Sequence, residues 1–286
     1  TQQESKNERS SIAGQGFPLG SGLTNISSAA LITGAAQNGS SWRLHSFLGR
    51  LNYDFNGKYL ASFTFRADGS SRFAAGNRYG FFPSASFGWN LDKEAFMADA
   101  KVLTALKLRA SYGYTGDQEI GDYQNISLWQ PGRYDGQSGL RPRNIADPNL
   151  TWQKNKSFNI GADYEFLGGV IGGSIEYFVA NRTDLLSNIP IAGTTGFATL
   201  TTNGGEVQDK GWEFSLTSKN IWTKKFRWTT SFNISYQKNT IKKLPVDGEL
   251  LSAYNDIAPT HIMKVGESVG TFWGVKYTGV NTENGD

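Results

Sequence analysis

From Ser41 onward, apolar and polar residues alternate with a period of two over most of the chain. In the segment "FLGRLNYDF", for example, Phe47, Leu51 and Tyr53 alternate with polar residues. Successive side chains of a β-strand point to opposite faces of the sheet, so this pattern predicts strands with one apolar and one polar face. The clearest segments are 47–55, 59–67, 83–91, 106–115, 158–166, 171–179, 212–217 and 226–239. A further strand is expected at 271–280.

The connections between these strands indicate how the sheet is built. Short connections are expected at 55–58, 167–169 and 219–225, and long ones at 116–154, 183–208 and 239–270. In an up-and-down sheet alternate connections lie at opposite ends, so one end has tight turns and the other has long loops. That asymmetry, with strands of about ten residues, is typical of outer-membrane β-barrels, which have short periplasmic turns and long extracellular loops.

The same alternation also fits a soluble β-sandwich, whose apolar face is buried between two sheets instead of facing lipid. Aromatic residues favour the barrel, because Tyr53, Phe55 and Tyr59 flank the first tight turn and Phe226 and Trp228 follow another. An interfacial aromatic belt would lie at these positions. We therefore expect an all-β, antiparallel transmembrane β-barrel fragment. The alternative is a secreted or surface all-β domain with a carbohydrate-binding or structural role.

Composition adds a boundary and excludes some function classes. Residues 1–40 are polar, rich in Gly, Ser and Asn and weakly periodic, so we expect an extracellular loop region there and the barrel segment at 41–286. The 34 glycines and the 13% of aromatic residues favour many strands and tight turns. The net charge is only +3 and the basic residues form no stripe, which argues against nucleic-acid binding. No apolar run is long enough for a membrane-spanning helix.

The sequence offers little for catalysis or metal binding. It contains no cysteine, only the histidines His45 and His261, and no H-E-x-x-H, G-x-S-x-G or phosphate-loop motif. Asp163 and Glu165 lie two residues apart on one strand face, as the paired carboxylates of a glycosidase would, but a polar lumen wall accounts for them without any chemistry. We expect no enzymatic activity, no cofactor and no metal site.

The segment "RADGSSRF", residues 66–73, combines three charges with glycine and serine directly after an alternating segment. It is either an anion-binding or catalytic cluster or the structural rim of a loop. We interpret it as the rim of an extracellular loop. Arg66 would end the lumen-facing row of its strand, and Asp68 with Gly69 would turn the chain out of the wall. A pairing of Asp68 with Arg66 or Arg72 is expected.

Together with "RYGFFPSASFGWNLDKEAF" at 78–96, this segment resembles a signature of the SusC/RagA family of TonB-dependent outer-membrane transporters of Bacteroidetes. Further family-like motifs are "LKLRASYGYTGDQEIGDY" at 106–123, "NIADPNLTWQKNKSFNIGADYEF" at 144–166 and "NGGEVQDKGWEFSL" at 203–216. The signature residues, for which we expect structural roles, are Arg66, Asp68, Gly69, Arg72, Gly80, Pro83 and Trp89. One departure is Gln153, where the family often has Glu.

The resemblance implies a barrel of about 22 strands that encloses an N-terminal plug, with a TonB-contacting segment ahead of the plug. Residues 1–286 resemble the middle-to-late barrel wall, about 8–10 strands, and match neither plug nor TonB segment. The resemblance further implies TonB-dependent import of an oligosaccharide or peptide across the outer membrane, with a SusD-like surface lipoprotein over the loop end. The polar face would then contact the plug, chiefly through Arg50, Arg66 and Arg109.

Substrate contacts are expected in the long loops, because binding residues concentrate on loops that a rigid scaffold positions. In loop 116–154 the candidates are the aromatic side chains of Tyr123, Trp129 and Tyr134, since aromatic faces stack on sugar rings. The alternative is that these side chains only pack the loop against its neighbours or against a covering protein.

Overall fold

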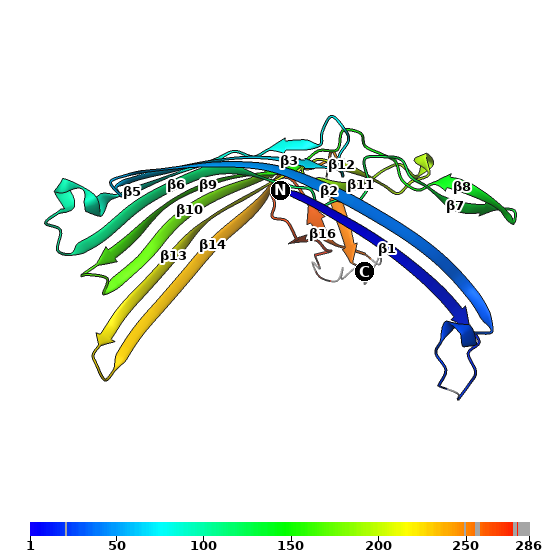
Figure 1. The fold of residues 1–286 in the computed structure, drawn as a ribbon, viewed down its shortest axis with the longest axis horizontal. Helices are drawn as coiled ribbons and strands as arrows, with labels where there is room; N and C mark the ends of the chain where they lie inside the picture. The colour runs from blue at the N-terminus through cyan, green and yellow to red at the C-terminus, as the bar shows by residue number, and fades with distance from the viewer. Residues whose placement is uncertain (21, 249, 255–257, 277–278, 280–286) are drawn as a thin grey trace.

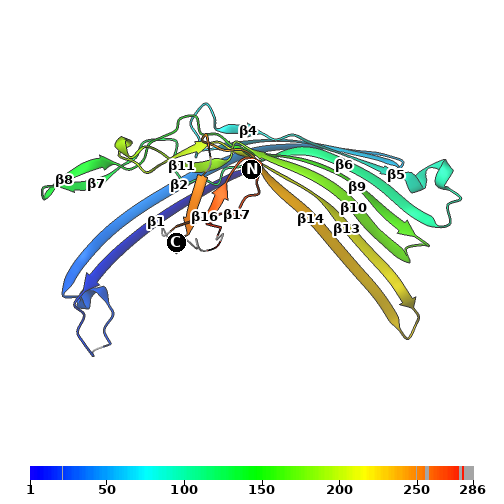
Figure 2. The same cartoon turned by 180° about the vertical axis from the view of Figure 1, so that it is seen from behind.

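The computed structural model describes residues 1–20, 22–248, 250–254, 258–276 and 279. Its main feature is a ten-stranded antiparallel sheet in the order β1-β2-β3-β5-β6-β9-β10-β13-β14, with β4 added beside β3. These strands are β1 (Gln2–Gln15), β2 (Leu31–Phe55), β3 (Tyr59–Ser70), β4 (Tyr79–Phe81), β5 (Ser84–Asn90), β6 (Leu103–Asp117), β9 (Gln153–Phe166), β10 (Ile171–Thr183), β13 (Glu206–Trp222) and β14 (Arg227–Lys243). The sheet is a single curved layer, like part of a barrel wall (Figures 1 and 2).

Smaller elements lie in the connections. They are the hairpins β7 (Trp129–Tyr134) with β8 (Gln137–Pro142) and β11 (Leu186–Pro190) with β12 (Thr199–Asn203), and the set β15 (Leu250–Tyr254), β16 (Ala258–Met263) and β17 (Thr271–Phe272). Short 3₁₀ helices are η1 (Ile26–Ser28), η2 (Leu91–Lys93), η3 (Ala95–Met97) and η4 (Gly193–Thr195). Among the described residues, no helix is long and apolar enough to span a membrane. The strand expected at 271–280 is reduced to β17; residues 277, 278 and 280 lie outside the described residues.

The strand register places the alternating side chains in continuous rows across the sheet. One apolar row contains Tyr53, Ala61, Phe87, Ala110, Ile160, Tyr177, Trp212 and Tyr236. The adjacent row, on the opposite face, contains Asn52, Ser62, Ser86, Ser111 and Asn159. Because the sheet is one layer thick, the apolar row is not covered, and Tyr53 and Trp212 are 57% and 55% exposed. The expected antiparallel sheet with one apolar and one polar face is confirmed.

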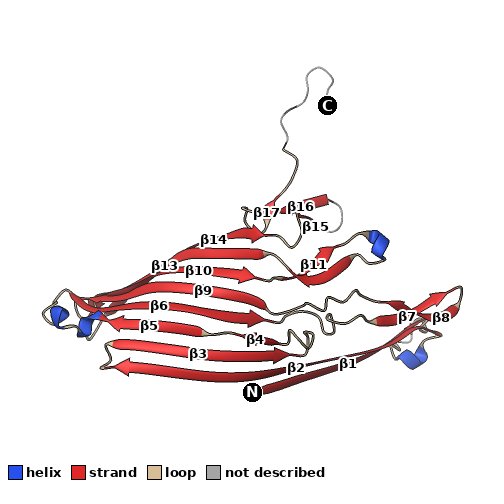
Figure 3. Cartoon of the chain, turned by 90° about the horizontal axis from the view of Figure 1, so that it is seen from above, coloured by secondary structure: helices blue, strands red, loops and turns tan. Residues whose placement is uncertain are grey.

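The two ends of the sheet differ as the connection lengths predict (Figure 3). Tight turns at 56–58, 167–170 and 223–226 join neighbouring strands at one end. The long connections 118–152 and 184–205 lie at the other end and contain the hairpins β7–β8 and β11–β12. In the first tight turn Asn56 and Gly57 have φ of 56° and 60°. Positive φ at the central residues of a turn matches the right-handed twist of the two strands that it joins.

Residues 1–40 do not form the irregular loop that we expect from the sequence. β1 pairs with the first part of β2 from Gln2 opposite His45 to Gln15 opposite Leu31, which makes a long hairpin. Both faces of this hairpin are mainly polar; on the face that carries Phe47 farther along β2, Arg43 forms an ion pair with Glu4 at 3.0 Å. A strand with water on both faces needs no apolar alternation, which explains why the period-two pattern begins only at Ser41.

At the tight-turn end, the carboxylate of Glu94 receives three hydrogen bonds. Lys58 Nζ donates at 2.9 Å, Tyr59 Oη at 2.8 Å and Trp89 Nε1 at 2.9 Å. These bonds join the turn between β2 and β3 to the segment that follows β5, and they give the signature residue Trp89 a structural contact. The hydrogen bonds from Lys58, Tyr59 and Trp89 lower the pKa of Glu94 from 4.5 to about 2.

This contact predicts a pH dependence of stability. A carboxyl whose pKa is lowered by folding stabilises the folded state above its unfolded pKa, and the contribution is lost as the pH falls from about 4.5 through about 2. On acidification from about pH 6 to about pH 3, we expect the wild-type protein to lose more thermal stability than a Glu94→Gln variant. Circular dichroism of the detergent-solubilised protein during heating measures the difference. A Glu119→Gln variant is the control, and an equal loss in all three proteins would contradict the prediction.

Candidate functional site

The loop end of the sheet contains a buried apolar cluster. It consists of Phe73, Phe82, Leu150 and Trp152, and both Phe73 and Leu150 have 0% of their surface exposed. Trp152 also donates from Nε1 to the Arg78 carbonyl oxygen at 2.8 Å. Phe73 and Phe82 come from the residues between β3 and β5 that flank β4, and the other two side chains come from the connection 118–152, so the cluster fastens 71–83 to 118–152. Full burial of one such side chain contributes about 1.5–3 kcal/mol.

Glycine and proline residues of the "RADGSSRF" and "RYGFFPS" motifs shape this end of the sheet. A Cβ on Gly69 would lie 2.6 Å from the Tyr79 ring, and one on Gly80 would collide with the Phe82 ring. Only glycine therefore allows these rings to lie across the backbone. The carbonyl oxygen of Pro83 accepts a hydrogen bond from the Tyr114 amide at 2.9 Å, which fixes the start of β5 beside β6.

Asp68 pairs with Arg66, as one of the two expected pairings predicts, with Nε and Oδ2 2.6 Å apart. Asp68 is only 5% exposed. It does not turn the chain, however, and neither does Gly69: both residues still lie in β3, paired with β2 on one side and β4 on the other. The turn follows Ser70, so the rim begins a few residues later than expected.

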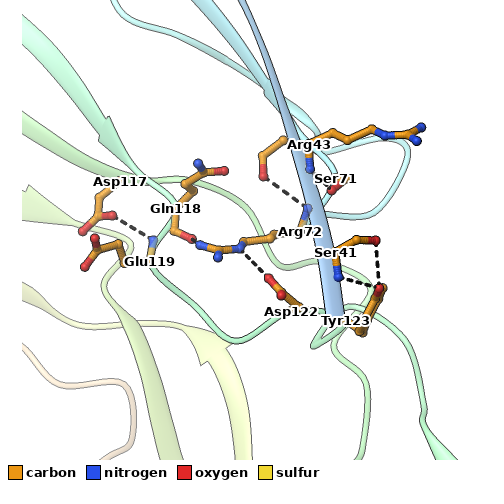
Figure 4. Close-up of polar contacts among 10 residues, drawn as sticks. Ser41, Arg43, Ser71, Arg72, Asp117, Gln118, Glu119, Asp122 and Tyr123 are labelled. Atoms are coloured by element: carbon orange, nitrogen blue, oxygen red, sulfur yellow. Dashed lines mark hydrogen bonds and ion pairs between the residues drawn. The ribbon is translucent and has the colours of Figure 1, made fainter. Parts of the chain in front are cut away.

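Arg72, the other expected partner of Asp68, fastens the long connection 118–152 instead (Figure 4). Its Nε donates to Asp122 Oδ1 at 2.9 Å and its Nη1 to the Gln118 carbonyl oxygen at 3.2 Å. Its guanidinium also lies over the ring of Trp42, 5.0 Å from the centroid. The Arg72 and Asp122 side chains are only 17% and 14% exposed, so this pair is shielded from water on most sides.

The next residue, Tyr123, fastens the same connection to β2 (Figure 4). Its hydroxyl accepts a hydrogen bond from the Ser41 amide at 2.9 Å and lies 3.1 Å from Ser41 Oγ. Its backbone has a φ of 65°, in the left-handed region that non-glycine residues seldom adopt. Tyr123 thus packs its loop against a neighbouring strand, which is the alternative to a substrate contact that the sequence left open for the loop aromatics.

Beside these two contacts, a groove of about 720 Å³ lies between the β1–β2 hairpin and the connection 118–152. The hairpin contributes Asn7, Arg9, Asn38, Gly39 and Ser40, and the connection contributes Gly121, Asp122, Tyr123, Gln124, Leu128, Trp129, Gln130, Pro131, Arg141 and Arg143. The register along β2 places Asn38 and Ser40 on the same face as Asn52. The groove therefore lies on the polar face of the sheet, at its loop end.

The structure brings two of the three aromatic candidates together. Tyr123 and Trp129 both border the groove, and Trp129 is 63% exposed. Tyr134 lies outside it at the tip of the β7–β8 hairpin, 88% exposed and adjacent to the turn residues Asp135 and Gly136. The side-chain oxygen of Asn144 accepts a hydrogen bond from the Leu128 amide at 3.0 Å, and its side-chain nitrogen donates to the Ile126 carbonyl oxygen at 3.1 Å, which holds the base of this hairpin beside the groove.

The basic residues of the groove are not among the site residues predicted from the sequence. Arg9 lies on β1, in the region expected to be a loop, so nothing in the pattern connects it with residue 141 or 143. Asn144 closes the base of the β7–β8 hairpin, which keeps Arg141 and Arg143 at the groove edge. The frequency of arginine in 116–154 is the only sequence signal that could have pointed to them.

The polar face farther along the sheet contains a charge network instead of paired catalytic carboxylates. Arg109 on β6 contacts Asp163 on β9 at 3.3 Å and Glu176 on β10 at 2.6 Å. Asp163 therefore pairs with a cation across strands, as a structural role predicts. Arg50 donates to Asn52 and Ser62 at 3.1 and 3.2 Å. Within the described ranges, no three His, Asp or Glu side chains converge to hold a metal ion.

Comparison with known proteins identifies the kind of wall that this sheet forms. Residues 10–286 match the model of the family described as "TonB dependent receptor-like, beta-barrel". The chain belongs to this family. It is 38% identical over 248 residues to TonB-dependent receptor P3 of Formosa agariphila, covering 83% of this chain and 24% of that protein. It is also 38% identical over 261 residues to TonB-dependent receptor SusC of Bacteroides thetaiotaomicron, covering 85% of this chain and 26% of that protein.

A solved structure, the RagAB peptide transporter, contains a chain that superposes on this one with a TM-score of 0.81 at 25% identity, covering 91% of this chain and 29% of that one. The chain spans about a quarter of the length of the curated relatives it matches. Family membership confirms the resemblance to SusC and RagA. It also selects an outer-membrane β-barrel wall over the secreted all-β domain, the alternative left open by the alternation alone.

The Arg72 contact predicts how the connection 118–152 responds to substitution. An Arg72→Gln variant leaves the poorly exposed Asp122 carboxylate without its cation, which costs about 1.5–3 kcal/mol locally. We expect faster hydrogen exchange of the amides from Gln118 to Leu128 in the complete receptor, while the strands of the sheet keep their protection. Arg133→Gln, at an exposed hairpin position, is the matched control. Unchanged exchange in the Arg72→Gln variant would contradict the anchoring role.

Proposed function

We propose that this chain forms part of the wall and loop end of a receptor that imports oligosaccharides, or peptides, across the outer membrane with energy transmitted by TonB. The observation that supports this most is the register of the sheet, with an uncovered apolar row on one face and polar rows on the other. Such a wall separates lipid from a hydrated lumen. The groove lies on the lumenal face at the end with the long loops, where a cargo would arrive.

The proposed partners are TonB and a SusD-like surface lipoprotein. TonB would act through a plug region of the complete receptor, and the polar wall would contact that plug through Arg50, Arg66 and Arg109. A SusD-like lipoprotein would cover the loop end, where the β7–β8 hairpin extends beyond the wall with Tyr134 and Leu140 88% and 71% exposed (Figure 3). The likeness to SusC and to a chain of the RagAB peptide transporter supports both partners.

Uptake measurements test this function. Cells that express the complete receptor should accumulate a fluorescent oligosaccharide or peptide cargo, and deletion of TonB should abolish accumulation while surface binding remains. A lipoprotein should co-purify with the receptor from detergent-solubilised outer membranes. Accumulation that continues at the same rate without TonB would contradict the proposal, and so would purification of the receptor without any lipoprotein.

The assignment of the faces predicts opposite responses at two adjacent positions. Ile160 lies in the apolar row at the middle of β9, and Asn159 lies in the neighbouring polar row. Arginine facing lipid near the bilayer midplane destabilises a barrel by about 2–4 kcal/mol, whereas lumenal arginine does not meet hydrocarbon. Ile160→Arg should lower the folded fraction of the complete receptor, and Asn159→Arg should not. Heat-modifiable gel migration measures the fraction, and the reverse order would show that the faces are assigned wrongly.

A further inference from the structure

The groove between the β1–β2 hairpin and the connection 118–152 carries uncompensated positive charge. Arg9, Arg141 and Arg143 line it, and Asp122 is the one carboxylate among its described lining residues. Asp122 is already paired with Arg72. None of the three lining arginines forms an ion pair with another described residue.

The side-chain acceptor beside Arg141 is neutral. In the amide orientation that satisfies both groups, Gln130 Oε1 accepts a hydrogen bond from Arg141 Nε at 3.1 Å. A neutral acceptor orients the guanidinium but does not offset its charge. The groove therefore presents cationic donors whose counter-charge is not supplied by the described part of the chain.

Strand register explains why Arg9 has no carboxylate beside it. Arg9 lies opposite Asn38, and both residues line the groove. Glu4 and Glu8 alternate to the other face of β1. There Glu4 pairs with Arg43 at 3.0 Å and Glu8 with Lys6 at 2.8 Å. The hairpin thus pairs its charges on one face and leaves a single cation on the groove face.

The rest of the groove lining suits a sugar chain. Trp129, which is 63% exposed, offers an aromatic face, and Asn7, Asn38 and Gln124 offer amide groups that can donate to and accept from hydroxyls. Arginine binds carboxylate and sulfate groups through two parallel hydrogen bonds. The groove volume of about 720 Å³ lies within the range of small-molecule sites.

We propose that this groove binds an anionic oligosaccharide, whose carboxylate or sulfate groups contact Arg9, Arg141 and Arg143 while a sugar ring stacks on Trp129. This inference rests on the proposed import function and adds the charge class of its cargo. Several separate cations along one groove fit a polymer with repeated anionic groups. The uncovered indole and the amides favour a sugar over an acidic peptide, which serves as a competing probe in the test.

Equilibrium binding to the complete receptor in detergent tests the inference. The probes are fluorescent oligomers of matched length: dextran sulfate, polygalacturonate, neutral dextran and polyglutamate. We expect at least one of the two anionic sugars to bind about tenfold or more tightly than neutral dextran, and to weaken as salt is added. Comparison of the dextran sulfate and polygalacturonate arms shows whether sulfate or carboxylate is the preferred group.

Single substitutions then locate the site. Arg141→Gln and Arg143→Gln should each weaken binding of the anionic sugar about tenfold. Trp129→Ala should weaken anionic sugars more than polyglutamate. Arg227→Gln removes the same charge at the tight-turn end, where Arg227 lies 4.6 Å from the Trp222 ring centroid, and should change affinity by less than about twofold. Heat-modifiable migration of every variant confirms that the barrel is folded.

Several results would overturn the inference: neutral dextran binding as tightly as the anionic sugars, unchanged affinity in the arginine variants, polyglutamate binding more tightly than both anionic sugars, or no binding of any probe. The proposed function is tested separately by TonB-dependent uptake. If uptake persists in the arginine variants and the receptor binds neutral sugar equally well, the proposed import function is retained and the inference of an anionic cargo is wrong. If uptake is independent of TonB, the import function itself fails.

Discussion

Lateral hydrogen bonding between neighbouring strands is the constraint on which this structure depends. A sheet one layer thick has no second layer to hold it, and hydrocarbon offers no partner to an unpaired backbone group. The ladders from β2 to β14 supply those partners, and their register decides which side chains meet lipid. A shift of β13 by one residue in the pairing register would move the Trp212 side chain from the apolar face to the polar face. The alternation of side chains and the backbone pairing therefore specify the same register.

The loop end uses different interactions for a different task. There the connections leave the ladders, and buried rings and one shielded ion pair hold them in place. Phe73 packs in the apolar cluster and its neighbour Arg72 forms an ion pair with Asp122, so two consecutive residues fasten the connection 118–152. The tyrosine that follows Asp122 then contacts β2. The groove residues are thereby held against the rigid wall, although most of them lie outside its regular strands.

The sequence predicts the wall better than the site, for physical reasons that particular residues show. Strands such as β9 can be predicted from the sequence because lipid on one face and water on the other impose alternation of apolar and polar residues, as Asn159 and Ile160 illustrate. Strand β1 cannot be predicted in this way, because both of its faces are exposed to water. The Arg66–Asp68 pair could be predicted since the two residues share one face of a strand. The partner of Arg72 lies 50 positions away, and only the folded connection brings Asp122 to it.

The length of β2 has a consequence for how such a receptor can change over time. Its 25 residues span about 80 Å, while the apolar band of an outer-membrane barrel is about 25 Å tall. The half that pairs with β1 therefore stands clear of the bilayer, together with the groove residues that it carries. Substitutions there do not share packing with the lipid-facing rows, and distant sites contribute to stability independently. Under the proposed import function, cargo preference can change through substitutions in this projecting half while the membrane-embedded half stays the same.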